Sequence, residues 1–430
     1  MRASTRAVTA ACAVYEVGGR SFDVDSREFA DVVAEAQASH RRLRCMCQTP
    51  GVEMYVARLA PAQAGYIVKR MPDTGWRHAT HCPSYAPPAE SSGLGQVLGS
   101  AILEDPATGV TTLKLGFVLS RVPGRTVAAP AVGASTSVRA DGARLSLRGL
   151  LHYLWDLSEL ARWHPGLAGK RNWGSVRRQL LRAADQLIAR REPLRSRLYI
   201  PEPFVVDQRE ALNARRLAAW SCAIAEPAGS VALMLLIAEV KEIAPARYGF
   251  KAVVKHLPDQ PFMIEESLYR RLGRCFEAEL ALWATGEDVH MMMIATFGVS
   301  GGVPTIQELC LMPVTRQWLP VDDVFGKQLV DQLVVEERAF TRSLQYELPA
   351  QASLAFAVLS DCGEQPETLS ILRRNQEALD VVAPDLDAAE KSWLWQTHLQ
   401  PLPALPPRAP TSAPSAAHGN EWAGGAGVRP

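Results

Sequence analysis

Three cysteines and one histidine near the N-terminus have the residue types and spacing of a zinc site. Cys45 and Cys47 are separated by one residue, and His78 and Cys82 follow after an intervening segment. Zn²⁺ is a borderline-soft cation that binds thiolate and imidazole well. The four side chains together would form a Cys₃His set. Such a set leaves no coordination position open, so the predicted site is structural rather than catalytic.

The elements around these residues must bring the two pairs together. The segments Val52 to Leu59 and Tyr66 to Arg70 predict a β-hairpin between them. His78 and Cys82 are four residues apart, which places both side chains on one face of a helical turn. We therefore expect a cysteine pair on a turn, then a hairpin, and then a His/Cys pair at the start of a helix, within a module of about residues 44–85.

Two alternatives to this ligand set stay open. His81 competes with His78, although its position next to Cys82 makes joint binding of one ion geometrically less natural. These residues could also be ordinary free thiols beside two solvated histidines, because a C-x-C pair is less specific than paired C-x-x-C motifs. Cys12, Cys222, Cys275, Cys310 and Cys362 are scattered, and eight cysteines in a long chain do not indicate a disulfide framework.

A second candidate region is basic. Residues 139–197 contain 13 Arg and Lys against five Asp and Glu. Helical periodicity predicts one helix through Leu147 to Leu157 and a second from about Lys170 to Arg191, with His164-Pro165-Gly166 between them.

The second predicted helix separates apolar from basic residues. Arg171, Arg178 and Arg182 cluster opposite its apolar face, and Lys170 lies near its start. Two helices followed by a strand fit a helix-turn-helix or winged-helix arrangement, in which these four residues would contact DNA phosphates. The alternative is a solvated polar face on a packed helix, which is the commoner use of such a pattern.

A third motif has the form of a nuclease fragment. Glu239-Val240-Lys241 follows the apolar run Val231 to Ala238. In metal-dependent nucleases an E-x-K at a strand end supplies a Mg²⁺ ligand and a lysine for the phosphate charge. The upstream Asp that this chemistry needs is not evident. The alternative is a solvated strand end.

Composition excludes some classes of protein. The chain has 430 residues, of which 47% are hydrophobic and 21% charged, with a net charge of +1. It has no general bias toward nucleic acid or membrane, so any such bias must be local. No apolar run reaches the length of a membrane span, and the N-terminus is too short and polar for a secretory signal. We expect a cytoplasmic protein with no membrane partner.

The pattern of elements predicts an α+β fold with a small zinc-ligand hairpin module, a two-helix basic region and a mixed α/β C-terminal domain. That domain includes a helix over Phe325 to Leu344 and strands over Met291 to Val299 and Ile306 to Val314. The predicted organisation is an N-terminal region at 1–121, a linker at 122–143, a helical, winged-helix-like region at 144–206, an α+β domain at 207–398 and a disordered tail at 399–430.

Several motifs together resemble an uncharacterised bacterial family, domain of unknown function number eleven seventy-three. They include Arg44-Cys-Met-Cys47, Tyr66-Ile-Val-Lys-Arg70, Cys82-Pro-Ser and Ile200-Pro-Glu-Pro-Phe204. The resemblance covers roughly residues 12 to 375. It implies a bacterial cytoplasmic protein carried with mobile DNA and no established reaction. Cys45, Cys47, His78 and Cys82 match the family's Cys/His pattern, whereas His81 departs from it.

These observations lead to three functional hypotheses. The first is a zinc-stabilised, non-enzymatic accessory protein associated with DNA of a bacterial mobile element. The second is a metal-dependent nuclease or other nucleic-acid enzyme, and the third is a protein-interaction scaffold whose partner the sequence does not identify. No Walker-type loop, G-x-S-x-G elbow or H-E-x-x-H pair is present to indicate another enzyme class.

Overall fold

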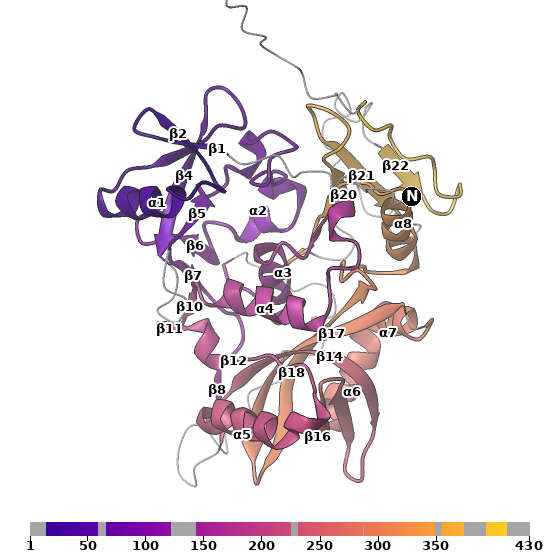
Figure 1. Cartoon of the computed structure of the whole chain (residues 1–430). Helices are drawn as coiled ribbons and strands as arrows, with labels where there is room; N and C mark the ends of the chain where they lie inside the picture. Colours follow the sequence, from indigo (N-terminus) through magenta and orange to yellow (C-terminus); the bar gives the residue numbers. More distant parts are fainter. Residues whose placement is uncertain are drawn as a thin grey trace, which may run out of the picture.

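The computed structural model describes residues 14–58, 66–121, 143–224, 231–286, 288–348, 355–373 and 393–410. Within these residues the chain combines several β-sheets with α-helices, which is the mixed α+β composition that the sequence predicts (Figure 1). The predicted linker at 122–143 lies, except for its last residue, outside the described residues. The predicted domain boundaries stay predictions.

The N-terminal module is a five-stranded antiparallel sheet in the order β2-β1-β3-β4-β5. Its strands are β1 (Val14–Val17), β2 (Arg20–Asp23), β3 (Leu43–Cys45), β4 (Val52–Arg58) and β5 (Tyr66–Arg70). Helix α1 (Phe29–Ala38) contacts β4 and β5 and buries Val33 and Ala36. The hairpin β4–β5 confirms the hairpin predicted for Val52 to Leu59 and Tyr66 to Arg70.

The middle of the chain contains a small mixed sheet and three helices. The sheet has the order β11-β10-β7-β6, in which β7 and β10 are parallel. Its strands are β6 (Ile102–Glu104), β7 (Thr111–Leu113), β10 (Leu187–Ala189) and β11 (Glu192–Pro193), and the helices are α2 (Leu94–Val97), α3 (Leu147–Leu157) and α4 (Trp173–Ala184). The prediction that the second helix reaches Arg191 is wrong. Residues 187–189 leave the helix because they pair with β7, a long-range contact that local periodicity does not contain.

The largest sheet has the order β12-β14-β15-β16-β18-β17, and β14 also pairs with β17. The sheet therefore closes on itself. Its strands are β12 (Leu198–Tyr199), β14 (Met234–Pro245), β15 (Phe250–Val254), β16 (Leu257–Ile264), β17 (Val289–Ser300) and β18 (Val303–Thr315). The accompanying helices are α5 (Arg209–Trp220), α6 (Glu266–Cys275) and α7 (Glu277–Trp283), and a short ladder joins β8 (Ser120–Arg121) to β13 (Val231–Ala232).

The C-terminal sheet has the order β22-β21-β20-β19-β9 and is covered by helix α8 (Val324–Val335). Its strands are β9 (Arg162–Trp163), β19 (Phe340–Arg342), β20 (Ala357–Leu359), β21 (Glu367–Leu372) and β22 (Trp393–Gln396). The predicted helix over Phe325 to Leu344 is too long, because residues 340–342 pair with both β9 and β20. Strand β9 joins this sheet from far earlier in the chain.

The predicted disordered tail does not begin at residue 399. Leu402 and Leu405 pack against the core beneath the C-terminal sheet. The carbonyls of Ala404 and Pro406 accept hydrogen bonds from Trp393 and Arg338. Residues 411–430 lie outside the described residues.

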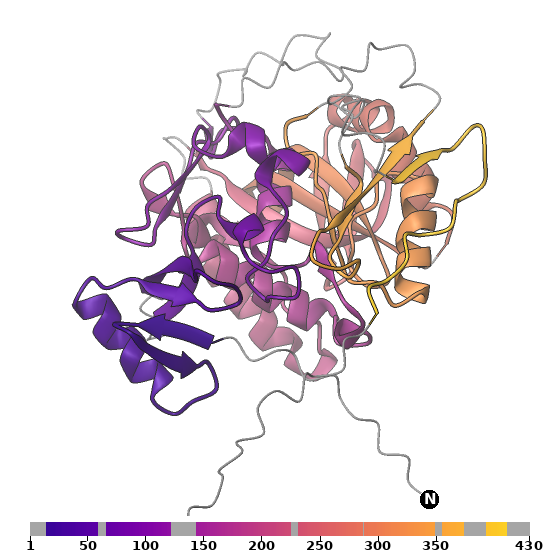
Figure 2. The same ribbon diagram turned by 90° about the horizontal axis from the view of Figure 1, so that it is seen from above.

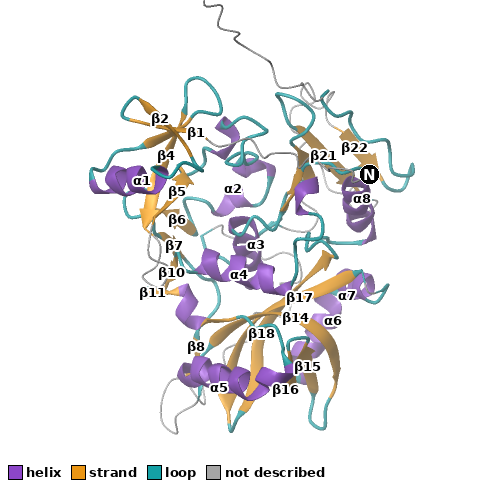
Figure 3. Cartoon of the chain, viewed as in Figure 1, coloured by secondary structure: helices purple, strands orange, loops and turns teal. Residues whose placement is uncertain are grey.

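The sheets lie around the central helices. Figure 3 shows α3 and α4 between the N-terminal and C-terminal sheets and above the closed sheet. Seen from above, the indigo N-terminal module and the yellow C-terminal strands lie on opposite sides of the molecule (Figure 2). One apolar cluster joins residues from Val97 to Tyr346, so α3 and α4 share their core with both the small sheet and the closed sheet.

Candidate metal centre

The end of β3 and two loops position the three cysteines and the histidine. Cys45 is the last residue of β3, the middle strand of the N-terminal sheet, where it pairs with Val52. Cys47 lies in the loop that leads to β4. His78 and Cys82 lie beyond β5, after the short 3₁₀ turn η1 (Gly75–Arg77). The sheet thus brings the end of β3 and the loop after β5 together.

The side chains of Cys45 and Cys47 meet those of His78 and Cys82 at separations that suit one tetrahedral ion. One ligand atom from each of the four side chains lies within 4.8 Å of all the others. The Sγ atoms of Cys45 and Cys82 are 3.7 Å apart, and His78 Nδ1 lies 3.4 Å from Cys47 Sγ and 3.8 Å from Cys82 Sγ. Tetrahedral zinc bonds of about 2.3 Å to sulfur and about 2.05 Å to nitrogen place two sulfurs about 3.8 Å apart and a sulfur and a nitrogen about 3.6 Å apart. These three separations are close to those values, so the donor set fits a zinc ion.

The surroundings favour negative charge on one of the three sulfurs, that of Cys82, whereas burial raises the pKa of Cys47. The backbone N–H groups of Ala79 and Ser84 donate to Cys47 Sγ and Cys82 Sγ at 3.5 and 3.3 Å. The hydrogen bond from Cys45 lowers the pKa of Cys82 to about 3, and it raises the pKa of Cys45 together with burial. A thiolate in this position is ready to bind a cation.

The imidazole of His78 is buried, at 3% exposure, and its Nε2 has no hydrogen-bond partner among the described residues. Its Nδ1 faces only the sulfurs of Cys47 and Cys82. A buried imidazole without a strong partner costs free energy, and a metal–nitrogen bond at Nδ1 would offset that cost.

The structure distinguishes the two histidines. His78 belongs to the cluster, whereas His81 is exposed and is not part of it. The predicted helix start is wrong, because His78 has extended backbone angles (φ −81°, ψ 154°) and is followed by a turn in which Cys82 N donates to Ala79 O. This turn brings the side chains of His78 and Cys82 to the same side, as a helical turn would.

The loop from His78 to Tyr85, which we call the metal loop, also attaches the N-terminal module to the rest of the chain. Arg162 of β9 donates to the backbone carbonyls of Cys82, Pro83 and Tyr85 at 3.2, 2.7 and 3.4 Å. Thr80 Oγ1 donates to the carbonyl of Gly363 at 2.8 Å. Sequence reasoning missed Arg162, because its guanidinium serves carbonyls far away in the chain and no local pattern marks such an arginine.

The predicted DNA-contacting residues do not share one environment. Lys170, Arg178 and Arg182 are exposed, and the latter two lie one turn apart on α4. Arg171 is different, and its predicted place on the helical face is wrong. It precedes the helix, and its guanidinium donates to the carbonyls of residues 159, 160, 162 and 317. Burial lowers the pKa of Arg171 to about 10, and the side chain is committed to the protein interior.

The nuclease fragment does not assemble a metal site. Glu239 is 4% exposed, and its Oε1 lies 2.6 Å from His290 Nδ1 and 2.5 Å from Lys255 Nζ. Burial raises the pKa of Glu239, but these hydrogen bonds outweigh burial and lower it overall. Lys241 is exposed and is not its partner. In the described ranges, no group of three or more His, Cys, Asp and Glu side chains with metal-binding separations includes Glu239.

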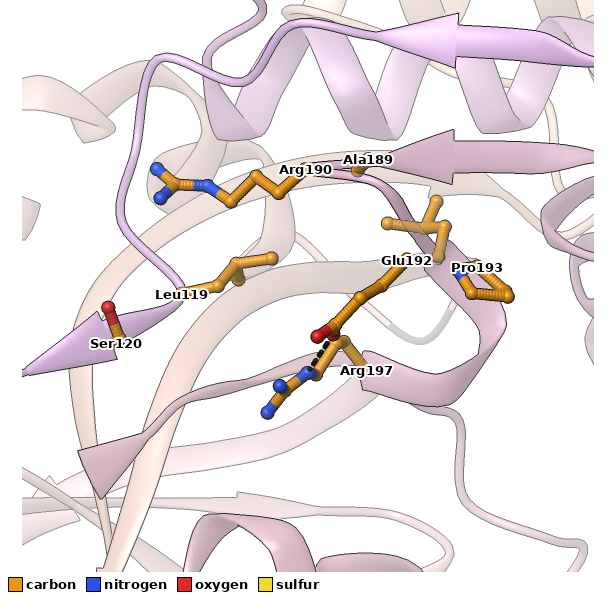
Figure 4. A pocket seen from close by; sticks show the side chains of 8 residues that line it. Leu119, Ser120, Ala189, Arg190, Glu192, Pro193 and Arg197 are labelled. Carbon is orange, nitrogen blue, oxygen red and sulfur yellow. Dashed lines mark hydrogen bonds and ion pairs between the residues drawn. The ribbon is translucent and has the colours of Figure 1, made fainter. Parts of the chain in front are cut away.

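A pocket of about 140 Å³ lies near the end of the basic region (Figure 4). It is bordered by β8, the hairpin β10–β11 and the turn η4 (Leu194–Arg197). Glu192 accepts from Arg197 Nε at 3.0 Å, whereas Arg197 Nη1 is buried and has no hydrogen-bond partner among the described residues. Arg190 lines the opposite side. The pocket is therefore lined by two guanidinium groups, of which that of Arg197 is held by Glu192.

Among the described residues, no helix is both long enough and apolar enough to cross a membrane. Comparison with family models matches residues 15–398 to a family described as a protein of unknown function (DUF1173). Neither a search of curated proteins nor a search of solved structures finds a match.

Proposed function

The chain belongs to the DUF1173 family, and from that premise we propose that it is a zinc-stabilised accessory protein that binds DNA. The proposal of a zinc site depends on one observation, namely that three sulfurs and one imidazole lie close together at separations near those of tetrahedral zinc. Hard cations such as Mg²⁺ and Ca²⁺ prefer oxygen ligands, which this cluster lacks, so zinc suits it better. With four protein ligands, zinc would order the loops of Cys47 and His78 and would leave no position for a substrate.

Metal content of the full-length protein tests this part. We expect about one zinc per chain in the wild type and none in Cys45→Ser/Cys47→Ser. The matched control is Cys222→Ser/Cys275→Ser, which removes two exposed thiols outside the cluster and should retain the metal. Wild-type protein without zinc, or a ligand variant that keeps it, would contradict the proposal.

The DNA part depends on the exposed cations of the basic region. Arg178 and Arg182 project from α4 and take part in no hydrogen bond or ion pair within the described residues. The following hairpin turn carries exposed Arg190 and Arg191. Exposed guanidinium groups suit the phosphates of a duplex. The mobile-element context and a cytoplasmic location are further parts of the proposal, implied by the family resemblance alone.

Duplex binding measured by fluorescence anisotropy over a range of salt concentrations tests the DNA part. Each lost phosphate contact should reduce the slope of log K against log salt by about 0.9, so Arg178→Ala/Arg182→Ala should reduce it by about 1.8. The control Arg20→Ala/Arg27→Ala removes two exposed arginines of the N-terminal module and should leave the slope unchanged. If both variants bind as the wild type does, α4 does not contact DNA and the scaffold hypothesis gains support.

A further inference from the structure

The closed sheet has a specific strand order. Going around it, β14 pairs with β15, β15 with β16, β16 with β18, β18 with β17, and β17 with β14 again. Numbered along the chain from first to fifth, the strands follow the order 1-2-3-5-4-1. The third and fifth strands are parallel, and the other four pairings are antiparallel. Helices α6 and α7 connect the third strand to the fourth.

The first strand belongs to both halves of this barrel. Its residues 234–240 pair with β17, and its residues 240–245 pair with β15 on the other edge. A bulge at Lys241 separates the two halves, and such an extra residue bends a strand where a sheet turns a corner. Leu268 and Leu272 of α6 pack into the barrel core. This arrangement is the topology of the OB-fold, a five-stranded Greek-key barrel.

One outer side of the barrel is already occupied. Side chains of β14, β17 and β18 that point outward, such as Leu235, Ile294 and Met312, join the apolar cluster that includes α3 and α4. The barrel fills the lower part of Figure 1, beneath these helices. The outer side of β15 and β16 has a different character, because the paired residues Lys251 and Met263 are only half-buried there.

The loop between β14 and β15 presents an aromatic ring and a cation to solvent. Tyr248 is 77% exposed, and the guanidinium carbon of Arg247 lies 5.3 Å from its ring centroid. Gly249 closes the hairpin at φ +80°, where a Cβ would lie 2.9 Å from the carbonyl oxygen of Ile264. The ring is therefore accessible to a ligand in solution, and a cation lies beside it.

We propose that this barrel binds single-stranded nucleic acid across β15 and the β14–β15 loop. Tyr248 would stack on a base, while Lys241, Arg247 and Lys251 would accompany the phosphate backbone. Three cations against the single acid Glu242 on this stretch favour a polyanion over a neutral oligosaccharide, the other common ligand of such barrels. A single strand is favoured over a duplex because stacking on Tyr248 requires an unpaired base. Since fold alone does not establish function, the inference depends on these four side chains.

This surface would add a second site to the proposed DNA association and rests on that proposal. The two sites can be tested separately, because Arg178 and Arg182 lie on α4 and not on the barrel. The probe is a fluorescein-labelled thymidine oligonucleotide of about 20 nucleotides, added to the full-length protein. Tyr248→Ala should weaken binding by about tenfold or more, while Tyr248→Phe, which keeps the ring, should bind almost as the wild type does. Arg247→Ala/Lys251→Ala should reduce the salt slope by about 1.4. Tyr66→Ala is the matched control, an exposed tyrosine of the N-terminal module.

Two results would overturn the inference. The first is a wild-type protein that does not bind the oligonucleotide. The second is an oligonucleotide affinity that Tyr248→Ala and Arg247→Ala/Lys251→Ala leave unchanged. If binding is instead lost in Arg178→Ala/Arg182→Ala, the proposed DNA association stands and the barrel is not its single-strand site.

Discussion

Arg162 offers a sharp test of how the metal loop is coupled to the rest of the protein. Its side chain is 22% exposed and donates to three carbonyls, one of them that of the ligand Cys82. A hydrogen bond from a charged donor contributes about 1.5–3 kcal/mol, and two of the three contacts are 3.2 Å or shorter. Because the carbonyls regain some hydration, we expect Arg162→Ala to lower the free energy of unfolding by about 2–4 kcal/mol.

The same substitution should weaken zinc binding. Groups that orient metal ligands typically contribute about 10–100-fold to metal affinity, and Arg162 fixes the chain at Cys82. Competition with a chromophoric chelator measures the affinity, and urea unfolding followed by tryptophan fluorescence measures the stability. The matched control is Arg44→Ala, since Arg44 is next to Cys45 but 47% exposed with only a 3.8 Å contact to Glu53. Equal stability and zinc affinity in the two variants would refute this account of the coupling.

Three further substitutions have defined outcomes. Asp361→Ala leaves the buried guanidinium of Arg338 without its carboxylate partner at 2.8 Å and should cost about 3–5 kcal/mol in urea unfolding; a cost below about 1 kcal/mol would contradict this. Burial raises the pKa of Asp156 to about 7, so the folded protein keeps this carboxyl protonated at pH values where the unfolded chain has lost the proton. The free energy of unfolding should therefore fall by up to about 1.4 kcal/mol per pH unit between pH 4 and 7. Asp156→Asn should remove this pH dependence, as measured by unfolding at each pH. Arg171→Ala should lower the free energy of unfolding by about 2–4 kcal/mol, whereas exposed Arg178→Ala should change it by less than about 0.5 kcal/mol, and the reverse order would be incompatible with the structure.

The ligand set of the metal cluster could be read from the sequence because it depends on residue type. Three cysteines and a histidine flank two segments that predict a hairpin, and that hairpin brings the four side chains together. The conformation at His78 could not be read in the same way. A four-residue spacing is compatible with a helix and with the turn that the chain adopts.

The error at Arg171 has a local cause. Asn172 and Ser175 form a capping box, so the helix begins at Trp173 and Arg171 precedes it. The N-x-x-S pattern was visible in the sequence, and it would have removed Arg171 from the helical face. Its four carbonyl partners could not have been predicted, because one of them belongs to Gln317.

The barrel could be predicted only in pieces. Alternating apolar residues identify β17 and β18, and the turn at Ser300 joins them. Closure depends on the pairing of β14 with both β15 and β17, and therefore on the bulge at Lys241. Glu239 and Lys241 have the spacing of a nuclease motif. In the structure they lie where β14 bends between the two halves of the barrel.

The N-terminal module has a small core, which a bound metal would help to stabilise. The cluster of buried side chains beneath its sheet is much smaller than those of the central helices and the barrel, and two of its members are Cys45 and Cys82 themselves. A unit of this size buries too little apolar surface to be stable alone and usually needs a metal or a disulfide. The loop that would be ordered by zinc is also the loop that Arg162 and Gly363 hold. Zinc binding would therefore stabilise both the fold of the module and its attachment to the helices and the C-terminal sheet.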